Sequence, residues 1–212
     1  MANNIVTEST SRSLDSVKVL GGVGSILALL GFLPVLGIAL SIVGLILVLV
    51  ALKYASDVLG DSRIFNDMLY AVVLGIVGIV VGVVGVAAVV LREMGLRYPY
   101  SPYAYALPSS VAPAEVLGTI GTVLIGLVAV WACFLLSSIF LRRSYGELGR
   151  RLNVSLFGTA AILYLVGAVL TIVLIGFLLI FVAEILLIAA FFSINTQLPP
   201  RPPMAQPAQS SI

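Results

Sequence analysis

The chain has 212 residues, of which 61% are hydrophobic and 9% charged, and its formal net charge is +2. Soluble domains carry about 25% charged residues, so a water-soluble fold of this composition would lack the polar surface needed to cover itself. The low net charge argues against nucleic acid as a partner, and a chain with no histidine and one cysteine, Cys133, lacks disulfides, Cys/His zinc sites and His-dependent triads. We therefore expect an all-α, polytopic bundle of transmembrane helices that is not an enzyme and holds no metal or cofactor.

The first helices follow from the charges that bound each apolar stretch. Residues 1–12 contain charges and no apolar run, so we expect a disordered N-terminus before a transmembrane domain over 13–196. The uncharged stretch from Val19 to Leu52 would extend about 51 Å as one helix, which exceeds a bilayer core of about 30 Å. The breaker Gly31-Phe32-Leu33-Pro34 divides it into helices over about 13–31 and 34–54, a short hairpin that either spans the bilayer or re-enters on the same side.

Four more helices follow. The uncharged residues 68–91 and 116–141 each fit one span, and the long stretch after Arg151 fits two spans with a break near Ile175–Gly176. The total is about six membrane helices. We expect the outer loop at 93–114 to place its tyrosines at the headgroup level or to act as a lid over a ligand or partner. The Pro-rich tail at 197–212 should be disordered, either as a plain solvated tail or as a Pro-rich recognition ligand.

Sidedness follows from the basic residues. The loop with Arg142, Arg143, Arg150 and Arg151 should face the cytoplasm by the positive-inside rule. An even number of helices on either side then places both termini in the cytoplasm, in a protein of the cell membrane.

The two ends of the chain resemble each other. Residues 26–31 align with 162–167 at an offset of 136, and Gly37 aligns with Gly176 at an offset of 139. A second echo relates Leu59-Gly60 to Leu148-Gly149 at an offset of 89, and Asn66 to Asn153 at an offset of 87. Both echoes relate helices of the same orientation, so the sequence predicts a parallel internal repeat, unlike the inverted repeats of many transporters.

Small residues mark helix-packing faces. In lipid, helices associate by close backbone approach through small residues, because apolar burial drives little association there. The spacing of these residues places each set on one helix face. They are Gly75, Gly78, Gly82 and Gly85 in the third helix, and Gly118, Thr122 and Gly126 in the fourth. These faces pack either within the bundle or against a second copy.

Glu184 is the one ionisable residue deep inside a predicted span. A charge at this depth is costly, so such residues mark ion pathways or subunit contacts by default. No cation lies at matching depth. Glu184 therefore handles protons or ions, contacts another subunit, or is a protonated packing residue bonded to Thr171, Tyr164 or Ser41.

The densest polar cluster lies in the inner loop before the third helix. It comprises Asp57, Asp61, Arg63, Asn66 and Asp67. Its carboxylates suit a hard cation, but their spacing matches no EF-hand. We expect instead that Asp61 or Asn66 caps the next helix and that Arg63 pairs with a neighbour.

Several short runs resemble a known family. They are residues 18–24, 46–54, 60–66 and 190–194. The chain is similar over most of 18–194 to a largely archaeal multi-pass membrane family catalogued as domain of unknown function 996. The resemblance implies an archaeal plasma-membrane protein and supplies no activity or binding residues; Glu184 is not part of that pattern.

Two functions fit these features. The first is a non-enzymatic accessory or scaffold subunit of a cell-membrane assembly, bound to other membrane subunits or to copies of itself in the lipid bilayer. The second is a small ion or solute transporter or channel that uses Glu184.

Overall fold

The computed structural model describes residues 2–93 and 113–195, and every regular element within them is helical. The elements are α1 (Ala2–Leu29), η1 (Leu30–Phe32), α2 (Gly37–Leu59), α3 (Ser62–Glu93), α4 (Pro113–Leu152), α5 (Ser155–Leu170), η2 (Thr171–Val173) and α6 (Ile175–Phe192). Six helices are long and apolar enough to cross a membrane. The all-α, polytopic architecture is therefore confirmed.

Both helix breaks expected inside the long apolar stretches are present. The first helix gives way to a 3₁₀ turn at Leu30, and α2 begins at Gly37, three residues after the proline that cannot continue a helix. The second break is the η2 turn, which leads to Leu174 with a φ of 63° and then to α6 at Ile175.

The N-terminal segment differs from the expectation of disorder. Residues 2–12 continue α1 as a helix. No glycine or proline precedes Gly21, so nothing in the backbone stops the apolar helix from extending toward its N-terminus. The Pro-rich tail at 197–212 and the tyrosines of the outer loop lie outside the described residues.

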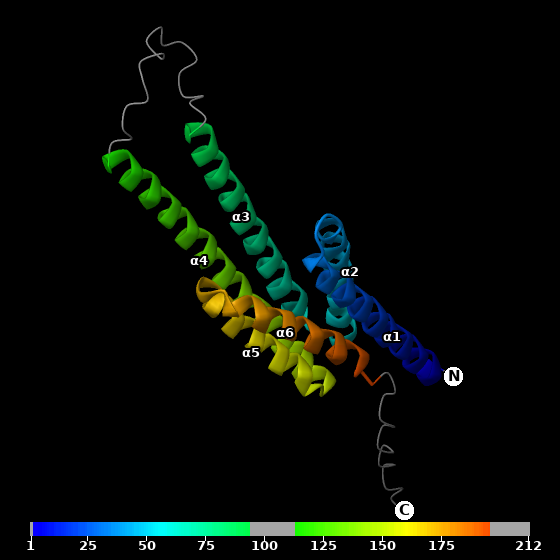
Figure 1. Ribbon diagram of the computed structural model, residues 1–212. Coiled ribbons are helices and arrows are strands. Elements are labelled where there is room, and N and C mark those ends of the chain that lie inside the picture. The colour runs from blue at the N-terminus through cyan, green and yellow to red at the C-terminus, as the bar shows by residue number, and fades with distance from the viewer. Residues whose placement is uncertain (1, 94–112, 196–212) are drawn as a thin grey trace, which may run out of the picture.

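The six helices form three antiparallel hairpins, α1–α2, α3–α4 and α5–α6. Each helix contacts the next in the chain, and α6 returns to contact α1, which closes a ring. Figure 1 shows that α3 and α4 continue well past the tips of the other two hairpins. The shared core therefore occupies only one end of the molecule.

The internal repeat extends to all three hairpins. In each hairpin, one glycine near the end of the first helix faces an equivalent residue near the start of the returning helix. The closeness of each pair is given by the distance between a methyl group placed on the glycine and the nearest side-chain atom of its partner. These pairs are Gly31–Ser41 at 2.8 Å, Gly82–Val130 at 3.4 Å and Gly167–Ile180 at 2.8 Å. The first and third pairs are related by the offsets 136 and 139 of the sequence repeat. In the second pair, Gly82 follows Gly31 by 51 residues and Val130 follows Ser41 by 89 residues, which is also the offset of the second echo.

The asparagine part of that second echo is wrong. Asn66 lies within α3, whereas Asn153 forms the turn before α5 with a φ of 55°. The left-handed backbone at the preceding junction belongs instead to Gly60, with a φ of 66°. Asparagine and glycine both tolerate this conformation, so each serves as the residue that ends a helix.

The three hairpins differ in how they turn. A methyl group on Gly37 would overlap the carbonyl oxygen of Gly31, and one on Gly176 would overlap that of Gly167, so the first and third hairpins turn tightly on a glycine pair. The repeat places Gly126 at the same position in the second hairpin, 89 residues after Gly37, but nothing lies within 4 Å of it. The second hairpin thus contains an insertion of about 35 residues. We call its described parts, residues 83–93 and 113–125, the hairpin extension.

The buried core lies at the opposite end, beside the α2–α3 and α4–α5 junctions. All six helices contribute to it, and its centre is aromatic. Phe157 packs edge-to-face on Phe191 with ring centroids 4.9 Å apart, and Tyr145 stacks on Phe157 at 6.0 Å. The other fully covered large side chains include Val17, Leu52, Ile64, Leu148 and Ile194.

Candidate functional site

Glu184 lies at the middle of α6, close enough to two tyrosines of other helices for its charge to act on them. Tyr145 of α4 and Tyr164 of α5 both lie within electrostatic range of its carboxylate. No side chain of the described residues donates a hydrogen bond to the carboxylate or forms an ion pair with it. The candidate site is therefore the Glu184 carboxylate with two phenols of other helices within its electrostatic range.

Two of the three partners expected for Glu184 are engaged elsewhere. The Thr171 hydroxyl donates to the carbonyl oxygen of Gly167 at 2.9 Å, and the Ser41 hydroxyl donates to that of Ile38 at 3.0 Å. Both bonds satisfy the hydroxyl within its own helix. Of the expected partners, only Tyr164 is a neighbour of the carboxylate.

The repeat shows that the fold does not require a carboxylate at position 184. The equivalent positions in the other hairpins are Leu45, 139 residues earlier, and Phe134, 50 residues earlier. Phe134 packs its ring against Tyr164 with centroids 6.2 Å apart. Since two of three hairpins hold an apolar side chain here, Glu184 is a departure from what packing needs, which favours a functional origin.

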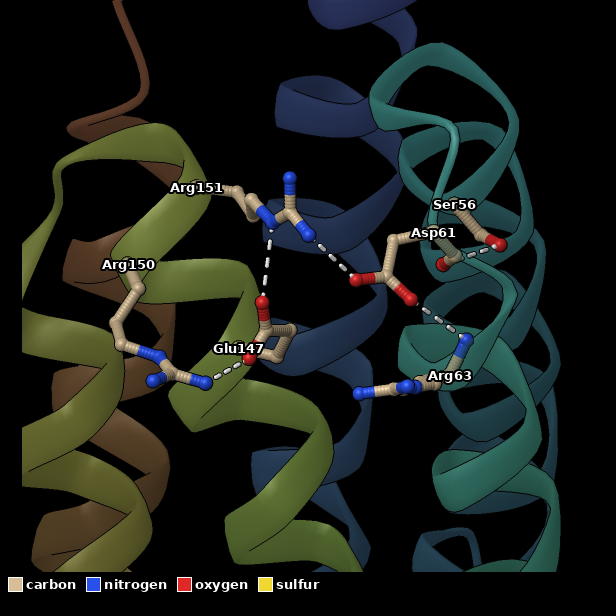
Figure 2. Close-up of polar contacts among 6 residues, drawn as sticks. All are labelled: Ser56, Asp61, Arg63, Glu147, Arg150 and Arg151. Atoms are coloured by element: carbon tan, nitrogen blue, oxygen red, sulfur yellow. Dashed lines mark hydrogen bonds and ion pairs between the residues drawn. The ribbon is translucent and has the colours of Figure 1, made fainter.

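A second polar site joins the α2–α3 junction to the end of α4 (Figure 2). Arg151 donates to Asp61 Oδ2 at 2.8 Å and to Glu147 Oε1 at 3.0 Å, and Arg150 also pairs with Glu147. Asp61 uses its other oxygen, Oδ1, to accept the backbone N–H of Arg63 at 3.1 Å. Its side chain thus caps α3 and pairs with α4 at once. We call Asp61, Glu147, Arg150 and Arg151 the ionic cluster.

The predicted inner-loop cluster is accordingly divided. Asp61 caps α3 as expected, but Arg63 contributes its backbone and not its side chain to the pairing. Asp57 pairs instead with Lys53 at 2.7 Å on the exposed face of α2. Asn66 and Asp67 lie further along α3, and the described residues contain no group of acidic, cysteine or histidine side chains suited to a metal ion.

Helix-to-helix hydrogen bonds to backbone carbonyls hold the neighbouring helices together. The hydroxyls of Ser137 and Ser144 donate to Ala71 and Ile64, each at 2.7 Å. The indole N–H of Trp131 donates to Ala168 at 3.2 Å, and the Lys18 ammonium donates to Ile194, at the end of α6, at 3.3 Å. Such bonds contribute about 0.6 kcal/mol each on average inside a membrane.

The predicted glycine faces are used only in part. Gly75, Gly78 and Gly82 face α4, opposite Ser137, Cys133 and Val130. At Gly85, Gly118 and Gly126 a methyl group would meet nothing within 4 Å, and the Thr122 hydroxyl donates to the Gly118 carbonyl at 2.9 Å. Helices α3 and α4 therefore pack closely through their small residues up to Gly82, and they no longer touch at these positions in the hairpin extension.

An apolar groove of about 1160 Å³ lies where helices α3 and α4 separate. Its walls are α3 and α4, and the tip of the α5–α6 hairpin closes one end. The lining residues are Gly75, Gly78, Ile79, Gly82, Val83, Val86, Ala87 and Val90 of α3; Leu124, Leu127, Val128, Val130, Trp131 and Phe134 of α4; and Thr171, Ile172, Leu174 and Phe177 of the tip.

Sequence reasoning missed the pairing partners of Asp61 and the groove. A local signal exists for part of the cluster, because Glu147 stands three and four residues before Arg150 and Arg151, the spacing of side-chain pairs on a helix. The contact of Arg151 with Asp61 spans 90 residues and has no local signal.

A family model described as a protein of unknown function, DUF996, matches residues 40–185. This match covers more than half of the chain, from α2 to the middle of α6. The chain belongs to the DUF996 family. The DUF996 chain is also 31% identical over 188 residues to an uncharacterized protein of Methanocaldococcus jannaschii, an alignment that covers 87% of this chain and 95% of that protein. No solved structure matches it. The expected archaeal family of unknown function is thus confirmed.

Proposed function

We propose that this protein is a non-enzymatic accessory or scaffold subunit of a cell-membrane assembly. The observation that carries the proposal is the hairpin extension, an insertion into one of three repeated hairpins that presents exposed apolar side chains on both helices. The other two hairpins turn tightly and have no such element. An element added to a repeat that packs without it is a natural place for a partner's helix to dock.

The proposed orientation places the ionic cluster and both termini in the cytoplasm. Support comes from Arg142, Arg143, Arg150 and Arg151, which gather near the α4–α5 junction, on the side where basic residues accumulate. The hairpin extension then points toward the outer surface, away from the core (Figure 1).

The native mass of the complex tests the scaffold function. The protein is extracted gently from its own membranes, and every co-purifying chain is identified. We expect foreign membrane subunits in a fixed ratio to this chain. A pure monomer or homo-oligomer that is functional alone in liposomes would contradict the proposal.

Glu184 favours a second function, transport of a proton or small cation. An intramembrane carboxylate within electrostatic range of Tyr145 and Tyr164, at a position where the repeat has Leu45 and Phe134, is the kind of group that ion pathways use. Against this function, the aromatic core closes the inner end of the bundle with fully covered side chains such as Phe157 and Phe191.

A flux assay separates the two functions. In liposomes that contain this protein alone, the transport function requires that Glu184→Gln abolish ion or solute flux measured in the wild type. The scaffold function predicts no flux in either protein and retention of the foreign subunits in the wild type.

A further inference from the structure

The charged end of the α3–α4 hairpin carries more positive than negative charge. Residues 61–67 and 142–151 contain five arginines and three carboxylates. Arg150 and Arg151 are paired in the ionic cluster, whereas the exposed side chains of Arg63, Arg142 and Arg143 pair with no carboxylate of residues 2–93 and 113–195. An exposed guanidinium without a carboxylate partner keeps its N–H donors for an anion.

Two of these three arginines lie on the same side of the hairpin. Helices α3 and α4 run antiparallel and face each other where the Ser144 hydroxyl donates to the Ile64 carbonyl oxygen at 2.7 Å. Arg63 and Arg143 each directly precede one of these facing residues, so the helical turn of about 100° per residue directs both to one side. Figure 2 shows the Arg63 side chain extending from α3 toward α4. Arg142, a further residue back, is turned to the far side of α4.

An aromatic pair identifies the same side. Tyr70 lies seven residues after Arg63, two turns along the same face of α3, and its ring packs on Phe140 of α4 with centroids 5.6 Å apart. The Arg143 guanidinium lies over the Phe140 ring, 5.7 Å from its centroid. Two guanidiniums and two rings thus form one surface, which we call the arginine–aromatic face (Arg63, Tyr70, Phe140 and Arg143).

The arginine–aromatic face lies where the apolar spans end. Residues 68–91 of α3 and 116–141 of α4 are uncharged, and at this end of the hairpin the charges begin at Asp67 and Arg142. The two neighbouring helices therefore pass from apolar to charged sequence at one level, which is where lipid headgroups lie. The exposed ring of Tyr70, one turn inside, is typical of that level.

We infer that the arginine–aromatic face binds the headgroup of an anionic membrane lipid. The guanidiniums of Arg63 and Arg143 receive the phosphate oxygens through paired N–H donors, and the rings of Tyr70 and Phe140 contact the lipid on the membrane side of the phosphate. Charge selects an anion, and the aromatic surface beside it selects an anion that carries an apolar chain. This site does not depend on the scaffold function or on which side of the membrane the charged end faces.

Two carboxylates share this side of the hairpin. Glu147 lies one turn beyond Arg143, but Arg150 and Arg151 already pair with it. Asp67 lies one turn after Arg63 and forms no ion pair within the described part of the chain. Its charge opposes that of a phosphate, so Asp67→Asn should strengthen the binding of an anionic lipid.

Lipid binding to the purified protein tests the inference. The protein in a neutral detergent is titrated with phosphatidylglycerol, and separately with phosphatidylcholine of the same chains, and bound lipids are counted by native mass spectrometry. We expect one site at which phosphatidylglycerol binds at least about tenfold more tightly. Equal affinity for the two lipids would overturn the inference. Displacement of phosphatidylglycerol by inorganic phosphate at equal concentration would do so too, because the site would then belong to a soluble anion.

Three single variants locate the site. Arg63→Gln and Arg143→Gln each remove a guanidinium from the arginine–aromatic face, whereas Arg142→Gln removes the same charge from the adjacent residue that is turned away. All three side chains are exposed, so the variants should fold as the wild type does. We expect phosphatidylglycerol to bind at least about fivefold more weakly to the first two variants and equally well to Arg142→Gln. An equal loss in all three would show attraction to net charge alone and would contradict the site.

Asp67→Asn gives a change of the opposite sign. We expect higher affinity for phosphatidylglycerol and unchanged affinity for phosphatidylcholine, and a loss or no change for phosphatidylglycerol would contradict the inference. Protein extracted gently from its own membranes should retain one anionic lipid that Arg63→Gln/Arg143→Gln loses. An acidic polypeptide retained in place of the lipid, and lost in the same double variant, would overturn the assignment.

Discussion

At the residue scale, Asp61 holds two helices by one side chain. It caps α3 through Oδ1 and receives Arg151 of α4 through Oδ2. We expect Asp61→Ala to lower the free energy of unfolding by about 1 kcal/mol, mainly because the cap is lost. Asp61→Asn keeps a capping oxygen and should lose less. The measurement is thermal or detergent-induced unfolding.

The control for this prediction is Asp57→Ala. Asp57 pairs with Lys53 on an exposed helix face, with 56% and 54% of the two side chains accessible, so its removal should change stability little. Equal losses for Asp57→Ala and Asp61→Ala would show that the cap and the link to α4 do not stabilise the fold.

Residue identity alone revealed part of the candidate site. The isolation of Glu184 among apolar residues was visible in the sequence, as was the capping pattern at Asp61. Tyr145 was not expected beside Glu184, because the packing of α4 against α6 through the core sets that neighbourhood. Contacts across 39 residues carry no local pattern that a sequence could display.

At the element scale, the tight hairpin tips depend on glycine where two backbones meet. Gly37→Ala and Gly176→Ala would place a methyl group against the carbonyl oxygens of Gly31 and Gly167. We expect each to destabilise the protein by about 1–3 kcal/mol, the usual cost of forcing atoms into a filled space. Thermal unfolding in detergent measures the loss.

The repeat supplies the control, because Gly126 occupies the equivalent position in the second hairpin and has open space around it. Gly126→Ala should leave stability unchanged or raise it slightly, since alanine favours a helix. If all three substitutions lower the free energy of unfolding equally, close backbone contact at Gly37 and Gly176 does not stabilise the hairpin tips.

The depth of the tips is a separate prediction. In a Cys133→Ser background, Val35→Cys and Leu174→Cys place a thiol at equivalent points of the first and third tips. If the short first and third hairpins re-enter on the same side, neither thiol should react with a charged, membrane-impermeant maleimide on either side of the membrane, because both tips then stay inside the hydrocarbon. Asp57→Cys should react from one side only. Labelling of Val35→Cys from outside would show that the first hairpin spans the bilayer.

The helices were largely predictable because proline and glycine punctuate the apolar stretches. The breaks predicted at Gly31–Pro34 and near Ile175–Gly176 are both present in the structure. The spacing of Gly75, Gly78, Gly82 and Gly85 also placed them on one face. The sequence does not show that α3 and α4 part beyond Gly82, since the angle between two helices depends on all the side chains between them.

At the scale of the whole molecule, three copies of one hairpin surround a core at one end, and the second copy, α3–α4, contains an insertion that lengthens both of its helices. The sequence revealed the relation between the first and third copies because both kept their short glycine turns. The second copy was obscured because its insertion separates the matched halves by 43 residues between Gly82 and Gly126. Equivalent contacts in space make the relation evident.

The central claim is that the hairpin extension, and not the shared hairpin core, meets a partner. A photo-crosslinking amino acid at Ile125 of the extension is compared with one at Ile38 of the first hairpin, residues with matched exposed fractions of 74% and 75%. After irradiation of native membranes, the account predicts adducts with a foreign polypeptide from Ile125 and adducts with lipid alone from Ile38. Polypeptide adducts from Ile38 without any from Ile125 would contradict it.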